Sequence, residues 1–234
     1  MKQPPGMNGS RLHPAWPTRQ VELAIGGISL LLRIPDHPHA LLDLSAVQQA
    51  SRENDYMPYW AHMWPAGLML GQWLVQQVSG TGEGPPGQRR AAQPPARVLE
   101  IGCGLAVPGL LAARLGYQVT LADYDPDAVE YARQNGRLNG VEVATELLDW
   151  RRPSGSRYPL ILGGDLLYEQ RNHQPLFEFF RLSLEQGGLV VLGDPCRLTA
   201  DGFLHDACSA GWRAQSEPTR WLDVPGRIIL LRQG

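Results

Sequence analysis

The chain has 234 residues, of which 43% are hydrophobic, so it is long and apolar enough for one large domain, or one domain with an appendage. Its formal net charge of −2 excludes the strongly basic balance that is typical of nucleic-acid-binding proteins. Cys103, Cys196 and Cys208 are odd in number and far apart, which indicates neither a disulfide framework nor a metal site. No apolar run has the length of a membrane span or the position of a signal core. These features predict a cytoplasmic protein, with neither a bound metal ion nor a membrane or nucleic-acid partner.

Two apolar runs near the N-terminus predict a β-hairpin. Residues 1–19 are rich in proline, glycine and polar residues, so we expect a loose tail there. The runs Val21–Ile25 and Ile28–Ile34 flank Gly26-Gly27, a dipeptide that favours a tight turn. We expect this hairpin to cover one edge of the domain. Residues 41–52 are compatible with either a helix or a loop.

An aromatic segment precedes the first long helix, which is predicted over residues 66–78. The segment holds Tyr56, Tyr59, Trp60, His62, Met63 and Trp64 within nine positions. Aromatic side chains before a helix most often serve packing. They can also form the wall of a ligand pocket, because aromatic faces attract cations such as a sulfonium or a lysine amine. His62 is either a base or, as for most single histidines, a hydrogen-bonded structural residue.

A low-complexity stretch over residues 79–96 follows this helix. It is rich in glycine, proline and polar residues and predicts a flexible, solvent-exposed loop. We divide the chain into an N-terminal tail and hairpin over residues 1–55 and a main domain over residues 56–234, with this loop inside the main domain.

Residues 97–123 hold the pattern around which the remaining chain is organised. An apolar run from Val98 to Ile101 predicts a buried strand, and Gly102-Cys103-Gly104 follows it as a turn. A helix over residues 107–115 and a second strand that ends at Asp123 complete the pattern. This is the first half of a nucleotide-binding α/β unit, in which the glycines let the backbone approach a ligand and the acid accepts from two ribose hydroxyls.

The turn also indicates which nucleotide would bind. A dinucleotide-binding turn carries a third glycine where this chain has Val107. Glu100 precedes the turn, where a carboxylate would repel a pyrophosphate but would suit a cation. S-adenosylmethionine, which carries a ribose, an amino group and a sulfonium, fits this set best. A nicotinamide dinucleotide and a purely structural turn are the alternatives.

The remaining elements predict an open, mostly parallel sheet. Strands are expected over residues 142–148, 158–163 and 189–193, helices over 126–138, 174–185 and 199–210, and an antiparallel pair of strands near 212–216 and 227–231. The central strands end in acidic or glycine-rich loops, at residues 102–104, 123, 149, 163–165 and 194. Because ligands bind at the carboxyl ends of the strands in such sheets, we expect these loops to form one site.

Five motifs together resemble a known family. They are Trp64-Pro65-Ala66, Glu100 to Leu105, Asp123, Asp149-Trp150 and Asp165-Leu166-Leu167-Tyr168. In this order and spacing they resemble the seven-strand S-adenosylmethionine-dependent protein lysine methyltransferases, specifically the methyltransferase-like 21 and electron-transfer-flavoprotein-β lysine methyltransferase group. The likeness covers roughly residues 56–195. The segment from Gly193 to Arg197 is closer to bacterial members of that group than to animal ones.

The resemblance implies an α/β fold with a Rossmann-like seven-stranded sheet, the last strand antiparallel and helices on both faces. It also implies the cofactor contacts, at Trp64, Glu100, Gly102, Cys103, Gly104, Asp123, Tyr124, Asp149, Trp150 and Asp165. Asp123 would accept hydrogen bonds from the ribose hydroxyls, and Asp149 would accept one from the adenine amino group. Trp150 would pack on the adenine ring. Asp165 and Tyr168 would be catalytic, lying beside the methyl group and the incoming nucleophile. Asp149-Trp150 has a structural alternative, a strand-end cap followed by a core aromatic.

The predicted function is methyl transfer from S-adenosylmethionine to a lysine side chain of a protein, by a monomer. One alternative is a small-molecule or nucleobase amine as the acceptor, although Leu166-Leu167 stands where nucleobase amino methyltransferases carry two prolines. A second alternative is a protein that binds S-adenosylmethionine without catalysis and acts through its interactions. The sequence does not identify the acceptor.

Overall fold

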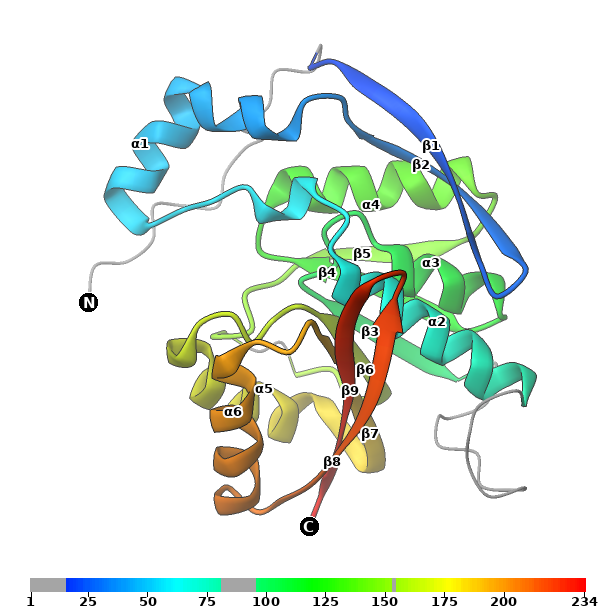
Figure 1. Cartoon of the computed structure of the whole chain (residues 1–234), viewed down its shortest axis with the longest axis vertical. Coiled ribbons are helices and arrows are strands. Elements are labelled where there is room, and N and C mark those ends of the chain that lie inside the picture. The colour runs from blue at the N-terminus through cyan, green and yellow to red at the C-terminus, as the bar shows by residue number, and fades with distance from the viewer. Residues whose placement is uncertain (1–15, 81–95, 153–154) are drawn as a thin grey trace.

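Seven strands form one sheet in the order β5-β4-β3-β6-β7-β9-β8 in this computed structural model, which describes residues 16–80, 96–152 and 155–234 (Figure 1). In chain order the strands are β3 (Arg97–Ile101), β4 (Gln118–Asp123), β5 (Val143–Leu147), β6 (Tyr158–Gly164), β7 (Leu184–Asp194), β8 (Trp212–Trp221) and β9 (Val224–Gln233). The β3–β4, β4–β5, β3–β6 and β6–β7 pairs are parallel. Strand β9 is antiparallel to both of its neighbours, so the predicted seven-stranded sheet with an antiparallel last strand is confirmed.

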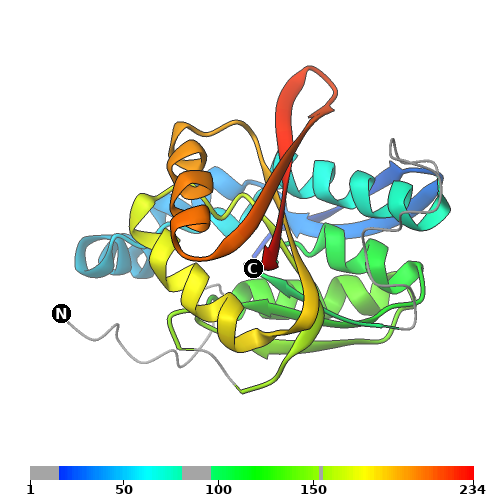
Figure 2. The same ribbon diagram turned by 90° about the horizontal axis from the view of Figure 1, so that it is seen from below.

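Helices cover both faces of this sheet, as predicted (Figure 2). They are α2 (Pro65–Ser79), α3 (Val107–Arg114), α4 (Pro126–Leu138), α5 (His173–Ser183) and α6 (Leu198–Ser209). Successive strand residues point to opposite faces. On β7, Val191 packs with α2 and α3 while Val190 packs with α5 and α6, and Ile228 and Ile229 of β9 divide in the same way. The middle of β7, residues 189–192, is therefore apolar on both faces, because both faces are buried.

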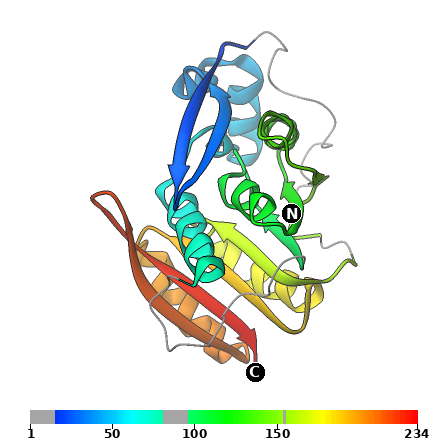
Figure 3. The same ribbon diagram turned by 90° about the vertical axis from the view of Figure 1, so that its right-hand side faces the viewer.

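The N-terminal hairpin consists of β1 (Thr18–Ile25) and β2 (Ile28–Pro35), which pair as a separate two-stranded sheet. It lies across α2, α3 and α4 on the side away from the large sheet (Figure 3). The expectation that it covers an edge of the domain is corrected: it forms an outer layer on one set of helices. The reason is that its apolar side chains, among them Leu30 and Leu32, join the same core as those helices.

Asn135 of α4 and Asn139, the C-cap residue of that helix, hold the backbone of β2. Asn139 Oδ1 accepts from the Leu31 N–H at 2.8 Å, and its Nδ2 donates to the Leu31 carbonyl at 2.8 Å. Asn135, fully buried, accepts from the Arg33 N–H at 2.7 Å. Their amides therefore take the place of a third strand along β2.

Replacing Asn139 by alanine is expected to loosen the hairpin locally. The Leu31 N–H and carbonyl both lose their partner, which should lower the free energy of unfolding by roughly 1–3 kcal/mol. Amide hydrogen exchange should accelerate at Leu31, while exchange in strand β4 serves as the internal control. Unchanged exchange at Leu31 would show that these hydrogen bonds do not hold the hairpin.

Three segments differ from their predicted form. The sequence is compatible with either a helix or a loop over residues 41–52. In the structure this segment forms the end of a short 3-10 helix (Pro38–Asp43), followed by α1 (Ser45–Asn54). Strand β7 begins at Leu184, before the expected turn, because Leu184 already pairs with Tyr158 ahead of an irregularity in the register. The two terminal strands are longer than predicted, because they continue as a hairpin beyond the point where β9 leaves β7 (Figure 2).

The predicted N-terminal tail and the loop over residues 79–96 lie almost entirely outside the described residues. Within the parts of the chain that the structure describes, no helix combines the length and apolar character needed to cross a membrane.

Candidate active site

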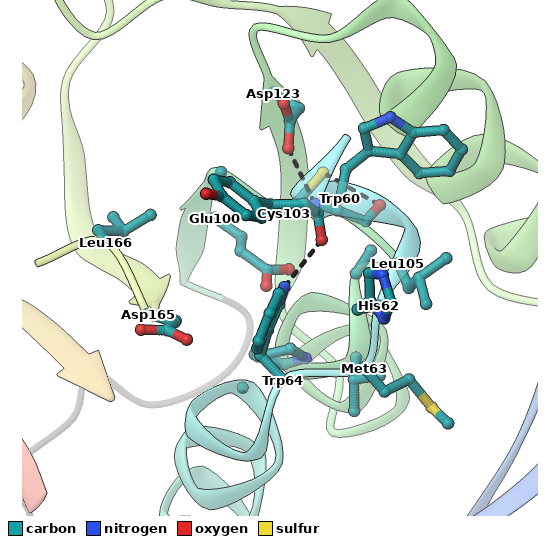
Figure 4. A pocket seen from close by; sticks show the side chains of 18 of the residues that line it. Trp60, His62, Met63, Trp64, Glu100, Cys103, Leu105, Asp123, Asp165 and Leu166 are labelled. Carbon is teal, nitrogen blue, oxygen red and sulfur yellow. Dashed lines mark hydrogen bonds between the residues drawn. The ribbon is translucent and has the colours of Figure 1, made fainter. Parts of the chain in front are cut away.

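A pocket opens at the carboxyl ends of β3, β4 and β6, where the strand order changes direction between β3 and β6. Ligands bind at this place in open α/β sheets. The pocket holds about 810 Å³ of empty space, part of it open to solvent. Figure 4 shows Asp123 at one end and Asp165 with Trp64 at the other, with Glu100 between them. Strand ends that are far apart in sequence thus contribute to one site.

The glycine turn after β3 forms the floor of the pocket. Gly102 and Gly104 both have positive φ, 57° and 50°, a conformation that favours glycine. A Cβ at Gly104 would lie 3.0 Å from the Trp60 carbonyl oxygen, so the turn and the aromatic segment approach each other closely only because Gly104 has no side chain. The turn therefore positions the aromatic segment as well as exposing its own backbone to a ligand.

Asp123 lies at the end of β4 and is 4% exposed. Its Oδ2 accepts from the Gly104 N–H at 2.9 Å, and its Oδ1 accepts from the Asp125 N–H at 3.0 Å. Burial raises the pKa of this carboxyl to about 7, and these backbone hydrogen bonds oppose the rise. A backbone hydrogen bond from Tyr124 also opposes the rise. The two carboxylate oxygens offer about four lone-pair sites, so accepting sites remain for a ligand hydroxyl in the pocket.

Glu100 lines the pocket but also supports the next helix. Its Oε2 accepts from the Gly109 N–H at 2.8 Å, in the first turns of α3. Burial raises the pKa of this carboxyl to about 8, the Gly109 hydrogen bond lowers it, and the charge of Asp123 raises it further. Glu100 therefore acts as a buried cap of α3 in addition to the cofactor contact that the resemblance implies.

Replacing Glu100 by glutamine should flatten the pH dependence of stability. Since folding raises this pKa from 4.5 to about 8, the folded protein keeps a proton that the unfolded chain releases, and stability falls as pH rises through that window. Glutamine keeps the acceptor for Gly109 and removes the titration. We expect the loss of unfolding free energy between pH 5 and pH 8, measured with urea, to shrink by on the order of a few kcal/mol. If the unfolding free energy of the wild type and of the glutamine variant changed equally with pH, this prediction would be wrong.

The residues after β5 are divided between the pocket and the protein interior. Trp150 lines the pocket, whereas Asp149 is not among the lining residues. The Asp149 Oδ1 instead accepts from the Arg151 backbone N–H at 3.0 Å and from its Nε at 2.7 Å. This contact matches the strand-end cap that the sequence offered as the alternative, and the adenine contact of Asp149 stays a prediction. Tyr124 and Cys103 also line the pocket, and burial raises the pKa of the Cys103 thiol well above its ordinary value, which makes this thiol a poor nucleophile.

The aromatic segment forms the outer wall. Trp64 Nε1 donates to the Tyr59 carbonyl at 2.8 Å, and the Tyr59 ring lies 5.5 Å from the Tyr168 ring in an edge-on arrangement. Tyr59 is 43% exposed and Trp64 is 37% exposed, so both rings are accessible from solvent. Trp60 is buried and packs against Tyr131 of α4. The segment therefore serves both packing and the pocket, through different residues.

Asp165 follows β6 and lines the pocket together with Tyr168. Its backbone is in the left-handed region, with φ of 58°, and its N–H donates to the Gly193 carbonyl at 2.9 Å. Its carboxylate forms a two-point ion pair with Arg197, a residue to which the sequence assigned no role. The sequence did contain a signal for this contact: Arg197 follows Asp194, which ends β7, the strand that pairs with β6. Burial raises the pKa of the Tyr168 hydroxyl to about 12, so this group stays protonated at neutral pH.

The pocket fits S-adenosylmethionine. A buried carboxylate with free lone pairs can accept ribose hydroxyls, the glycine turn leaves room for a ligand against the backbone, and aromatic rings lie near the mouth, where a sulfonium is favoured. Among the described residues, no group of three or more histidine, cysteine or acidic side chains could hold a metal ion.

Fold and site together define a Rossmann-like protein with a nucleoside pocket at the switch point of its sheet. Residues 50–199 match the family model described as lysine methyltransferase, and the chain belongs to that family.

Individual proteins similar to this chain are methyltransferases whose names give different acceptors. The chain is 32% identical over 146 residues to the electron transfer flavoprotein beta subunit lysine methyltransferase of Xenopus laevis, covering 60% of this chain and 53% of that one. It is 28% identical over 141 residues to the histone-arginine methyltransferase METTL23 of the same species, covering 55% and 53%. The chain therefore spans about half the length of these curated relatives. The 16S rRNA N2 G1207 methyltransferase RsmC of T. thermophilus shares the fold, with a TM-score of 0.61 at 15% identity over 93% of this chain and 51% of that one.

Proposed function

We propose that this protein transfers a methyl group from S-adenosylmethionine to a lysine side chain of a protein. The observation that carries the proposal is one pocket with a buried carboxylate, Asp123, at one end and a second acid, Asp165, with two accessible aromatic rings at the other. Membership of the lysine methyltransferase family supports the same reaction.

The bound cofactor would supply a methyl group on a positively charged sulfur, which leaves as a neutral thioether when the acceptor nitrogen forms its new N–C bond. Asp123 and the glycine turn would hold its nucleoside part. Asp165 and Tyr168 would orient the acceptor amine at the other end, and Tyr59 and Trp64 would line its approach. Positioning of this kind can supply roughly 7–11 kcal/mol of the barrier.

The acceptor amine must be neutral to react. A free lysine has a pKa near 10.4, so only about one amine in 10³ carries a lone pair at pH 7.4. Removal from water lowers this pKa, and so does a nearby positive charge. The proton that the ammonium loses passes to solvent, and the pocket must avoid adding unpaired negative charge beside the acceptor.

The test is a methylation screen. The purified protein is incubated with tritiated S-adenosylmethionine and an extract of the cell that makes it, and labelled proteins are analysed by mass spectrometry. We expect a methyl group on a lysine of one or a few proteins. Label on arginine would contradict the acceptor class, label only in small molecules would favour the small-amine alternative, and no label with intact binding would favour the non-catalytic one.

We also propose that the protein acts in the cytoplasm and on protein rather than nucleic acid. All three cysteines, Cys103, Cys196 and Cys208, are free thiols, which is typical of a reducing compartment. The net charge of −2 provides no general attraction for phosphates.

A further inference from the structure

The carboxylate of Asp165 is held by Arg197. Arg197 Nε donates to Oδ1 at 2.5 Å and Nη2 donates to Oδ2 at 2.8 Å, so both oxygens are engaged by one planar guanidinium. The Asp165 side chain is 5% exposed. The guanidinium also lies 6.0 Å from the centroid of the Tyr168 ring, which lines the pocket as Asp165 does, so the ion pair borders this end of the site.

A second ion pair fixes the Arg197 backbone. The Arg197 N–H donates to Asp194 Oδ2 at 3.1 Å, and its carbonyl accepts from Arg227 Nη2 at 3.0 Å. Arg227 Nε donates to the same Asp194 oxygen at 2.9 Å, and Asp194 is fully buried. Asp194 and Arg227 face each other across the β7–β9 pair, so the sheet itself sets the position of Arg197. An arginine held this firmly is a preformed partner for Asp165.

The charge of Asp165 would work against the proposed reaction if it were unpaired. A carboxylate about 4 Å from an amine in a partly buried site favours the ammonium form by a factor of up to about 10³. The two-point pair cancels this charge while leaving a lone pair on each oxygen to accept an N–H bond. Hydrogen bonds to the Asp165 carboxylate in turn raise the pKa of the Arg197 guanidinium, so Arg197 keeps its positive charge.

We infer that Arg197 is a positioning residue for the proposed methyl transfer, which holds Asp165 in place and neutralises it so that the acceptor amine can lose its proton near neutral pH. The inference rests on the proposed function. The other titratable and charged groups around the pocket and the ion pair come from several elements: Tyr59 and His62 at and after the 3-10 helix Tyr59–Ala61, Glu100 and Cys103 on β3 and its turn, Asp123 and Tyr124 at β4, Tyr168, Glu169 and Arg171 after β6, Asp194 at the end of β7, and Arg227 on β9.

The test is the pH dependence of methyl transfer from tritiated S-adenosylmethionine to the most strongly labelled protein of the cell extract, measured for wild type, Arg197→Gln and Arg197→Lys. The glutamine variant should need a pH more than one unit higher to reach half of its maximal rate, and its rate at pH 7 should fall at least tenfold. The lysine variant keeps the charge and should retain the wild-type pH profile with a lower maximal rate. The double variant Asp165→Asn/Arg197→Gln, which lacks both charges, should also return towards the wild-type profile.

Arg97→Gln is the matched control, because Arg97 is an exposed arginine that pairs with Glu185 at the start of β3, away from the carboxyl ends of the strands, and does not line the pocket. Its pH profile should be unchanged. A rate for Arg197→Gln that falls by the same factor at every pH, or does not fall, would overturn the inference while leaving the proposed function intact. No transfer by the wild type would overturn the proposed function and this inference with it.

Discussion

Replacing Asp123 by alanine is expected to weaken the binding of S-adenosylmethionine by at least about 100-fold. A hydrogen bond to a charged group contributes roughly 1.5–3 kcal/mol, and the proposed ribose contact has two of them. The measurement is calorimetric titration with S-adenosylmethionine. Since burial raises the pKa of Asp123 to about 7, the wild-type affinity should also rise between pH 6 and pH 8 as the carboxylate ionises.

Glu146→Gln provides the matched control for Asp123. Glu146 pairs with Ala122 on the neighbouring strand, so its substitution removes one acid beside the same strand end without touching the pocket. Its affinity should stay within about twofold of wild type. Because Asp123 also accepts from Gly104 and Asp125, the alanine variant should be checked for folding by circular dichroism. A folded Asp123→Ala protein with wild-type affinity would contradict the ribose assignment.

Replacing Asp165 by asparagine is expected to reduce the initial rate of methyl transfer to extract proteins by at least about 100-fold. The amide cannot form the two-point ion pair with Arg197, so both the orientation of the side chain and its acceptor geometry are lost. A displacement of about 1 Å at a reacting group can cost about 10²-fold in rate. The affinity for S-adenosylmethionine should change less than about threefold, because the nucleoside is held at the other end of the pocket.

Asp201→Asn is the control for this variant. Asp201 belongs to the same network of charges, through Arg227, but it is largely exposed and does not line the pocket. Its rate should remain close to wild type. Loss of S-adenosylmethionine binding in Asp165→Asn, with the rate per bound cofactor unchanged, would show that Asp165 serves the cofactor and not the acceptor.

The central strands β3, β4, β6 and β7 could be predicted because each holds a short apolar run that is followed by a glycine or an acid. Helix α4 begins at Pro126 and ends at Leu138 as predicted, and Asp125 caps it by accepting from the Asp127 N–H at 2.9 Å. These signals are local, so they can be read without knowing the fold. The meeting of the strand-end loops in one pocket then follows from the geometry of a parallel sheet.

Long-range contacts could not be predicted in this way. The docking of the hairpin depends on Asn135 and Asn139, which lie more than 100 positions away in the sequence from the strand they hold. The ion pair between Asp165 and Arg197 depends on where β7 leaves the sheet, and the engagement of Asp149 by Arg151 depends on a side-chain conformation. Residue types at strand ends indicate which side chains meet in the pocket. They do not indicate which carboxylate oxygens already accept a hydrogen bond from the protein itself.

Binding of the cofactor is tested by calorimetric titration of the wild-type protein with S-adenosylmethionine and with S-adenosylhomocysteine. We expect one site per chain with a dissociation constant in the micromolar range for both, competition between the two, and loss of both in Asp123→Ala. Absence of binding by a folded wild-type protein would remove the basis of the proposed methyl transfer, since the roles assigned to Asp123, Asp165 and Arg197 all depend on that cofactor.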